Sequence, residues 1–172
     1  LKGGFGGHLH NIGGHSVPLI QPLQYQYSYE TESRVANQAS AGPTHGDTTD
    51  YNDIEFLENT EGQHRIASIC VFHDDEFVHG LDVKYIEKGD EIWTKGIGAE
   101  WNHEDHRFKK IVFAQDEWIS NISGSFGNVC DLLIITTTKG RQESFGNLDR
   151  DPDFNFEIPE GQVISGISFG IG

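Results

Sequence analysis

The sequence contains no methionine, only two cysteines in 172 residues, and far fewer basic than acidic side chains. Twelve Lys and Arg against 27 Asp and Glu give a formal net charge of -15, which repels a nucleic-acid backbone and an anionic membrane surface. No apolar run approaches the roughly 20 residues that span a bilayer. The sequence therefore predicts no nucleic-acid partner and no membrane insertion.

The scarcity of sulfur leaves the disulfide state open. Cys70 and Cys130 form no C-x-x-C pair, and they suit one disulfide or two small buried hydrophobic side chains. The missing methionine and the start at Leu1 predict a processed product, a fragment or part of a longer polypeptide, with any targeting signal removed. Asn121 begins an N-x-S acceptor pattern and is the predicted glycosylation site. We expect a secreted or extracellular protein.

What the sequence has in quantity is glycine and β-forming residues. Twenty-one glycines, frequent Thr, Ile, Val and Phe, and few apolar stripes of helical period predict an all-β protein. From Arg65 onward, short apolar runs alternate with turn signals every eight to twelve residues, which is typical of a sandwich, barrel or prism. The nine runs are IASICVF, FVHGLDVKYI, EIWTKGI, FKKIVF, WISNISG, VCDLLIITTT, ESFGNL, FNFEI and VISGISF.

The N-terminal part of the chain differs from this strand series. Residues 1–19 have a glycine-rich turn and a short apolar stretch, and prolines follow at Pro18 and Pro22, as where a last strand leaves a fold. Residues 20–41 are predicted to be a linker that contains an extended stretch, because residues 24–29 alternate strictly and the remainder is polar and small. The tyrosines of this linker could pack on the surface of the neighbouring domain or serve as aromatic contacts for a ligand.

Two motifs match patterns of catalysis or calcium binding, and both are interpreted as structural. G-x-S-x-G ends at Gly170, with no later His or acid to complete a nucleophile elbow. Alternate residues from Asp149 to Glu160 have the spacing of a calcium loop, but Phe154 replaces the required glycine and Pro159 stiffens the exit. A solvated acidic turn is the preferred interpretation, with weak surface calcium binding as the alternative.

Histidine is abundant, but its groups do not predict a metal site. The densest stretches, residues 73–76 and 103–106, are predicted to be polar turns. In a turn, unlike a helix, the i, i+3 spacing of His103 and His106 does not place their side chains on one face. No Ser/His/Asp or Cys/His arrangement can be assembled. We therefore expect no enzyme activity, no catalytic residue, no metal and no cofactor.

Five longer stretches occur in a linked order, and in that order they resemble the jacalin-related lectin family. The resemblance implies a β-prism of three Greek-key four-stranded sheets, with residues 42–172 as the main domain. The stretches are GPTHGDTTDYND, HRIASICVFHDDEFVHGLDVKYI, DEWISNISGSFGNV, LLIITTTKGRQESFG and FNFEIPEGQVISGISFGIG.

In the family a further strand, with a sugar-binding aspartate before it, follows the equivalent of Gly172. Here the segment GGHLHNIG at residues 6–13 resembles that strand, and His10 stands where the family has aspartate. Residues 1–19 are therefore expected to be a closing strand. They complete their own prism by circular permutation, or the prism of another copy by strand exchange or tandem repetition.

The resemblance implies a sugar site built by the opening loop and the loop before the closing strand. Because a neutral histidine supplies one acceptor at most, whereas a carboxylate accepts two charge-assisted bonds, we expect weak or altered carbohydrate binding. The alternative is a structural subunit of a filament or matrix, assembled head to tail, in which the sugar site has lapsed. Glycans and copies of the chain are the expected partners. The expected carbohydrate-binding residues are Gly6, Gly7, His8, Leu9, His10, Gly42, Gly46 and Asp47.

Overall fold

The computed structural model describes residues 9–18, 37–41, 49–52, 64–87, 90–95, 107–156 and 162–171. In this part of the chain all regular structure is β, and no helix is long and apolar enough to cross a membrane. The strands are β1 (Leu9–Pro18), β2 (Asn37–Ala41), β3 (Thr49–Asn52), β4 (His64–His73), β5 (Val78–Glu87), β6 (Asp90–Lys95), β7 (Arg107–Val112), β8 (Ile119–Phe126), β9 (Cys130–Thr137), β10 (Gln142–Gly146), β11 (Phe154–Asn155) and β12 (Gln162–Ile171).

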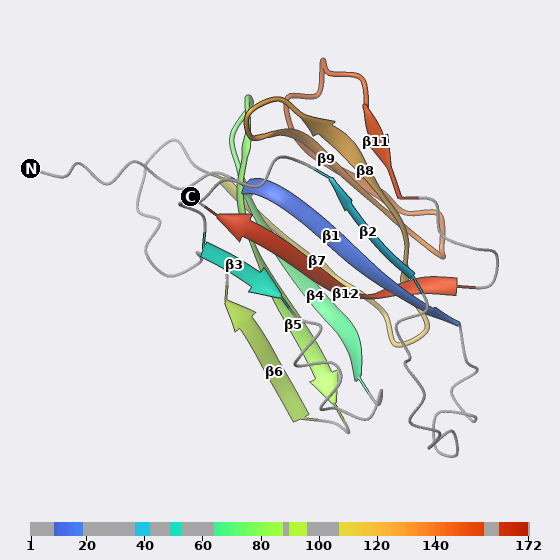
Figure 1. The fold of residues 1–172 in the computed structure, drawn as a ribbon. Coiled ribbons are helices and arrows are strands. Elements are labelled where there is room, and N and C mark those ends of the chain that lie inside the picture. The colour runs from blue at the N-terminus through green and yellow to red at the C-terminus, as the bar shows by residue number, and fades with distance from the viewer. Residues whose placement is uncertain are drawn as a thin grey trace, which may run out of the picture.

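The strands form three groups of four. One sheet has the order β6-β5-β4-β7. The other eight strands are connected, but a single residue pair, Ile164 with Ile119, joins β12 to β8. On either side of that pair lie the groups β11-β8-β9-β10 and β3-β12-β1-β2, which Figure 1 shows as separate layers. The expected three four-stranded sheets are confirmed.

All three groups follow the Greek-key order, in which the fourth strand returns beside the first. Strands β4 to β7 and strands β8 to β11 have this order along the chain. The third group has it only when β12 is read first and is followed by β1, β2 and β3. The connectivity of the third sheet thus runs across the two ends of the sequence. This is the relation expected of a circularly permuted prism, and here β1 pairs within its own chain.

The core lies where the three sheets face one another. Alternate residues of the first sheet, such as Ile69 and Val83, point inward and are fully buried because apolar side chains gain from leaving water. The same cluster includes Ile122 and Ile135 from the second sheet and Ile167 from the third. One core therefore holds the described strands together.

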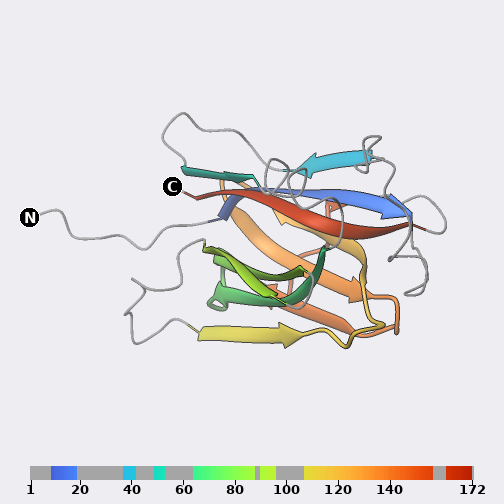
Figure 2. The ribbon, with the colours of Figure 1, turned by 90° about the horizontal axis from the view of Figure 1, so that it is seen from below.

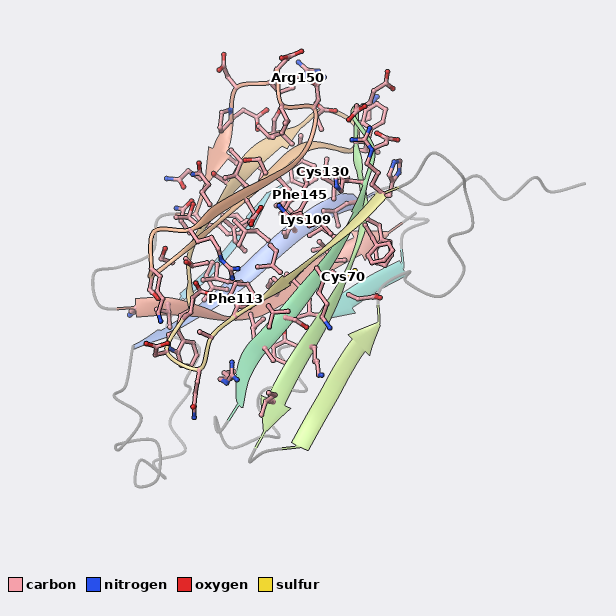
Figure 3. All side chains as sticks on the ribbon, turned by 180° about the vertical axis from the view of Figure 1, so that it is seen from behind. Cys70, Lys109, Phe113, Cys130, Phe145 and Arg150 are labelled. Atoms are coloured by element: carbon pink, nitrogen blue, oxygen red, sulfur yellow. The ribbon has the colours of Figure 1, made fainter. Side chains whose placement is uncertain are left out.

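Two polar contacts join the sheets, one inside the core and one at the surface. The backbone N–H of Ile167 donates to the hydroxyl of buried Tyr85 at 3.3 Å, which fixes β12 to β5. Lys109 of β7 forms an ion pair with Glu143 of β10. Figure 3 labels Lys109 on β7. These contacts set the relative positions of sheets that share few backbone hydrogen bonds.

Two glycines are required by close packing of the backbone. A Cβ on Gly124 would lie 2.0 Å from the carbonyl oxygen of Leu132, and one on Gly146 would lie 2.2 Å from that of Asp131. Gly146 also has a φ of +88°, in the left-handed region that glycine tolerates best. These positions let β8 and β10 approach β9 closely.

Each of the nine apolar runs predicted from Arg65 onward coincides with a strand, β4 to β12. The N-terminal boundary differs from the prediction: Asn37–Ala41 falls within the predicted linker, residues 20–41, but forms β2 beside β1. The physical reason is that backbone pairing with β1 outweighs the weak strand preference of these small, polar residues. The tyrosine-rich stretch at residues 24–29 lies outside the described residues.

Both cysteines are free thiols. Cys130 is fully buried in the core, and Figure 3 shows it well separated from Cys70, which lies half-buried on β4. Burial raises the pKa of the Cys130 thiol well above its ordinary value; burial, followed by the charge of Asp82, raises that of Cys70. The interpretation of Cys130 as a small core hydrophobe is confirmed.

Candidate functional site

The ends of four strands of the third sheet gather at one end of the molecule. Leu9, at the start of β1, pairs with Ile171, at the end of β12. Ile171 also pairs with Thr49, where β3 begins, while β2 ends at Ala41 opposite Ile12 of β1. Figure 2 shows the start of β1 and the end of β12 side by side. Both predicted sugar loops, residues 6–10 and 42–47, are therefore attached to this end.

Leu9 and His10 are the predicted site residues that the structure describes. Leu9 has 0% exposed surface and belongs to the core cluster, so its side chain cannot contact a ligand. The main chain of His10 lies in β1 at an irregularity, because Leu9 pairs with Ile171 and Asn11 with Gly170, leaving His10 between them. Such bulges re-aim side chains and often lie beside functional sites. Gly6, Gly7, His8, Gly42, Gly46 and Asp47 lie outside the described residues.

The core fixes the position of this irregularity. Leu9 and Ile12 flank it in sequence, and both side chains are buried, with exposed fractions of 0% and 1%. β1 is also paired on both sides, with β12 and with β2. The main chain of this irregularity is therefore held between two buried side chains.

Figures 1 and 2 both place the β8–β9 turn toward the end where β1 begins. Behind this turn lies Asp131, which is buried, pairs with Arg150 at 3.3 Å and would contact a Cβ on Gly127. Asp153 reaches the same hairpin, accepting from the N–H of Phe126 at 3.3 Å. These carboxylates hold the turn and the β10–β11 loop together. Sequence reasoning missed Asp131, because nothing local distinguishes it from a solvated aspartate.

The acidic turn between β4 and β5 is also organised from within. Asp74 accepts hydrogen bonds from the N–H groups of Glu76 at 2.7 Å and Phe77 at 2.8 Å, and its other oxygen lies 2.6 Å from Nε2 of buried His79. Burial alone would raise the pKa of Asp74, but these hydrogen bonds hold it below its ordinary value. Asp75 is exposed. The polar-turn interpretation is confirmed for this stretch, and Asp74 is its structural centre.

The nucleophile-elbow and calcium-loop motifs find no supporting geometry. The G-x-S-x-G pattern lies inside β12, where an extended strand replaces the sharp turn a nucleophile needs. Among the described residues no group of three His, Cys, Asp or Glu side chains could hold a metal ion. Asp149 and Asp151 of the calcium-like run are exposed, while Glu157 and Glu160 lie outside the described part.

The predicted glycosylation site lies within β8. The side-chain amide of Asn121 donates to the side-chain oxygen of Asn155 at 2.5 Å and to the backbone carbonyl of Phe156 at 3.1 Å. A neutral amide has two N–H donors, and both are engaged here. Attachment of a sugar to that nitrogen would break at least one of these bonds. Glycosylation of Asn121 stays a prediction. His103 and His106 lie outside the described residues.

Comparison with known proteins gives a family match and a fold match. The family model of the jacalin-like lectin domain matches residues 38–170. The mannose-binding lectin from champedak has 16% identity and a TM-score of 0.51, over 75% of this chain and 90% of its own. Artocarpin in complex with mannotriose has 17% identity and a TM-score of 0.50, over 77% and 95%. No curated protein matches this chain in sequence.

Proposed function

Because this chain belongs to the jacalin-like lectin family, whose members bind carbohydrate, we propose that it is an extracellular lectin-like module with weak or altered carbohydrate binding. The proposed site is the end of the third sheet where β1 begins and β12 ends. The proposal includes no catalytic step, since a lectin binds its sugar without transforming it.

The observation that carries the proposal is the register at the start of β1. The pairing of Leu9 with Ile171 brings the N-terminal strand to the position that a strand following β12 would occupy. His10 then stands where the family resemblance implies an aspartate. A carboxylate accepts two charge-assisted hydrogen bonds from sugar hydroxyls, whereas a neutral imidazole accepts one and an imidazolium none. Binding should therefore be weakened rather than abolished, because main-chain donors do not depend on this side chain.

Titration calorimetry with free mannose and a mannose trisaccharide tests the proposal, since two structurally similar lectins are described with mannose or mannotriose. We expect dissociation constants in the millimolar range. Binding should also weaken as the pH falls through the titration range of histidine, because protonation removes the remaining acceptor. Silence at millimolar sugar, together with silence on a broad glycan array, would contradict the proposal.

The alternative role is a structural subunit completed head to tail. In this role an exchanged β1 would make, with β12 and β2 of a neighbouring copy, the contacts that it makes here within its own chain. Light scattering after size exclusion, followed by electron microscopy of concentrated samples, separates the two roles. Filaments or a concentration-dependent series of oligomers support the structural role, and a monodisperse monomer opposes it.

A further inference from the structure

The loop between β10 and β11 contains a peptide bond that differs chemically from all others in the chain, the bond from Asp151 to Pro152. It joins the sole Asp-Pro pair in the sequence. Proline makes its peptide nitrogen a tertiary amide, and such a nitrogen takes up a proton and leaves as an amine more readily than an ordinary amide nitrogen. The side-chain carboxylate of Asp151 can reach the backbone carbonyl carbon of the same residue and form a cyclic anhydride with it.

The fold leaves this bond open to solvent. Asp151 and Pro152 are both exposed. Among the described residues the side chain of Asp151 has no hydrogen bond or ion pair, so nothing holds its carboxylate away from its own carbonyl carbon. A nucleophile that belongs to the same residue as its target reacts far faster than one that must arrive from solution. Acid and water therefore have access to a bond with a built-in nucleophile.

The chain on the N-terminal side of this bond is anchored to strand β9. The guanidinium of Arg150 pairs with the buried carboxylate of Asp131 at 3.3 Å. The backbone N–H of Asn147 donates to the backbone carbonyl of Asp131 at 2.8 Å, and that of Arg150 donates to the carbonyl of Asn147 at 3.2 Å. Figure 3 labels Arg150 in this loop, at the edge of the molecule. A chain end created after Asp151 would stay next to β9.

The chain on the C-terminal side of the bond is anchored to strand β8 and then to the core. The backbone N–H of Asp153 donates to the carbonyl of Gly124 at 2.8 Å, and the carboxylate of Asp153 accepts from the N–H of Phe126 at 3.3 Å. Strand β12 follows, pairs with β1 from end to end, and contributes Ile164 and Ile167 to the core cluster. None of these contacts depends on the bond between Asp151 and Pro152.

We propose that the Asp151–Pro152 bond is an acid-labile cleavage site that divides the chain into two segments, residues 1–151 and 152–172, which remain folded together. An oxygen of the Asp151 carboxylate attacks the backbone carbonyl carbon of Asp151, and the bond to the proline nitrogen breaks as the cyclic anhydride forms. The nitrogen takes a proton from the acidic solution. Water then opens the anhydride, and Asp151 becomes the new C-terminus with its side-chain carboxyl group restored.

The reaction is a hydrolysis and involves no oxidation or reduction. One water molecule is consumed, and the products are a carboxyl group on Asp151 and a secondary amine on Pro152. Since this amine is protonated in acid, it does not attack the anhydride and re-form the bond. Acidification is therefore the trigger, and the cut persists when the pH returns to neutral.

The test of the cleavage is incubation of the full chain in dilute formic acid, followed by mass spectrometry under denaturing conditions. We expect two products with the masses of residues 1–151 and 152–172, which together equal the mass of the chain plus one water. Their amounts should grow with time at the expense of the intact chain. A chain that stays intact, or that is cut equally at other aspartates, would overturn the proposal.

Three variants identify the reacting groups. Asp151→Glu enlarges the ring that must close, and Pro152→Ala restores an ordinary amide nitrogen, so each should slow the cleavage at least about tenfold. The matched control is Asp149→Glu, which makes the same change at an exposed aspartate that no proline follows and should leave the rate unchanged. Equal rates in Asp151→Glu and the unchanged protein would show that the Asp151 carboxylate is not the nucleophile.

The claim that the two segments remain folded together is tested after the cleaved protein has been returned to neutral pH. Size exclusion and native mass spectrometry should give one species with the mass of the chain plus one water. Asp151→Glu, carried through the same acid treatment, separates the effect of the cut from that of acid. Separation of the segments in the cleaved protein, with a normally folded Asp151→Glu variant, would overturn this claim. No sugar is used, so the outcome does not depend on the proposed lectin function.

Discussion

Replacing Ile12 by alanine tests whether β1 is an integral part of the fold. Ile12 is 1% exposed and lies in the core cluster. Three carbon atoms leave the core, at about 0.8 kcal/mol for each buried carbon group. The cavity that remains adds to this, so we expect a loss of about 3–4 kcal/mol, within the roughly 2–5 kcal/mol found for such substitutions. A typical domain has a total stability of about 5–15 kcal/mol, so the loss is a large fraction.

The assay is urea unfolding followed by tryptophan fluorescence, with Leu148→Ala as the matched control. Leu148 is 68% exposed, so its truncation should change the free energy of unfolding by less than about 0.5 kcal/mol. The loss in Ile12→Ala should shift the thermal midpoint down by about 10 °C for a chain of this size. If Ile12→Ala unfolds at the same urea concentration as the unchanged protein, β1 is not packed against the core, and the description of the third sheet is wrong.

The same measurement at two protein concentrations distinguishes the two ways of completing the prism. If β1 closes its own chain, the unfolding midpoint does not depend on concentration. If β1 is exchanged between copies, the midpoint rises with concentration because association stabilises the folded form. The intrachain pairing of Leu9 with Ile171 leads us to expect the first result.

Three further predictions concern turns and buried charges. Glu117 is 7% exposed and accepts from the partly exposed Arg141 at 2.7 Å, so Glu117→Ala should lower the free energy of unfolding by about 2 kcal/mol in urea titrations. A change below about 0.5 kcal/mol would show that this hydrogen bond does not stabilise the fold. Gly146→Ala should lower the free energy of unfolding by about 3 kcal/mol or more, and Gly140→Ala by about 1 kcal/mol. Both glycines have a positive φ, but only a Cβ on Gly146 would clash with a neighbouring carbonyl oxygen. Equal losses in the two variants would refute the clash. Folding lowers the pKa of the Asp74 carboxyl, so the stability that this carboxylate contributes is present above pH 3.8 and is lost as the pH falls through its pKa in the folded state. The difference in unfolding free energy between the unchanged protein and Asp74→Asn should therefore shrink on acidification, and a difference that grows would contradict this.

The strands of the core could be predicted from sequence because their apolar runs are bounded by turn residues. Runs such as FKKIVF and VCDLLIITTT are rich in β-forming residues, and both form strands. β2 could not be found in this way, because Asn37–Ala41 contains no large apolar residue and is ordered by pairing with β1. The order of the third sheet could be expected only from the resemblance of residues 6–13 to a closing strand.

Site features that depend on pairing register were beyond sequence reasoning. The irregularity of β4 between Ile66 and Ser68 follows only from its pairing with β5. Buried Glu117 and its partner Arg141 are 24 residues apart, with no local signal that joins them. The family resemblance predicts that His10 stands in place of an aspartate, but its place in an irregularity of β1 follows only from the pairing with β12.

The central claim is that the start of β1 supplies a lectin site weakened by His10. The most direct measurement is a calorimetric titration of the unchanged protein and of His10→Asp with the same neutral sugar, mannose. A carboxylate that accepts charge-assisted bonds should gain about 1.4 kcal/mol, a tenfold increase in affinity. Equal or weaker binding by a folded His10→Asp protein would contradict the claim that this position is the sugar-binding one.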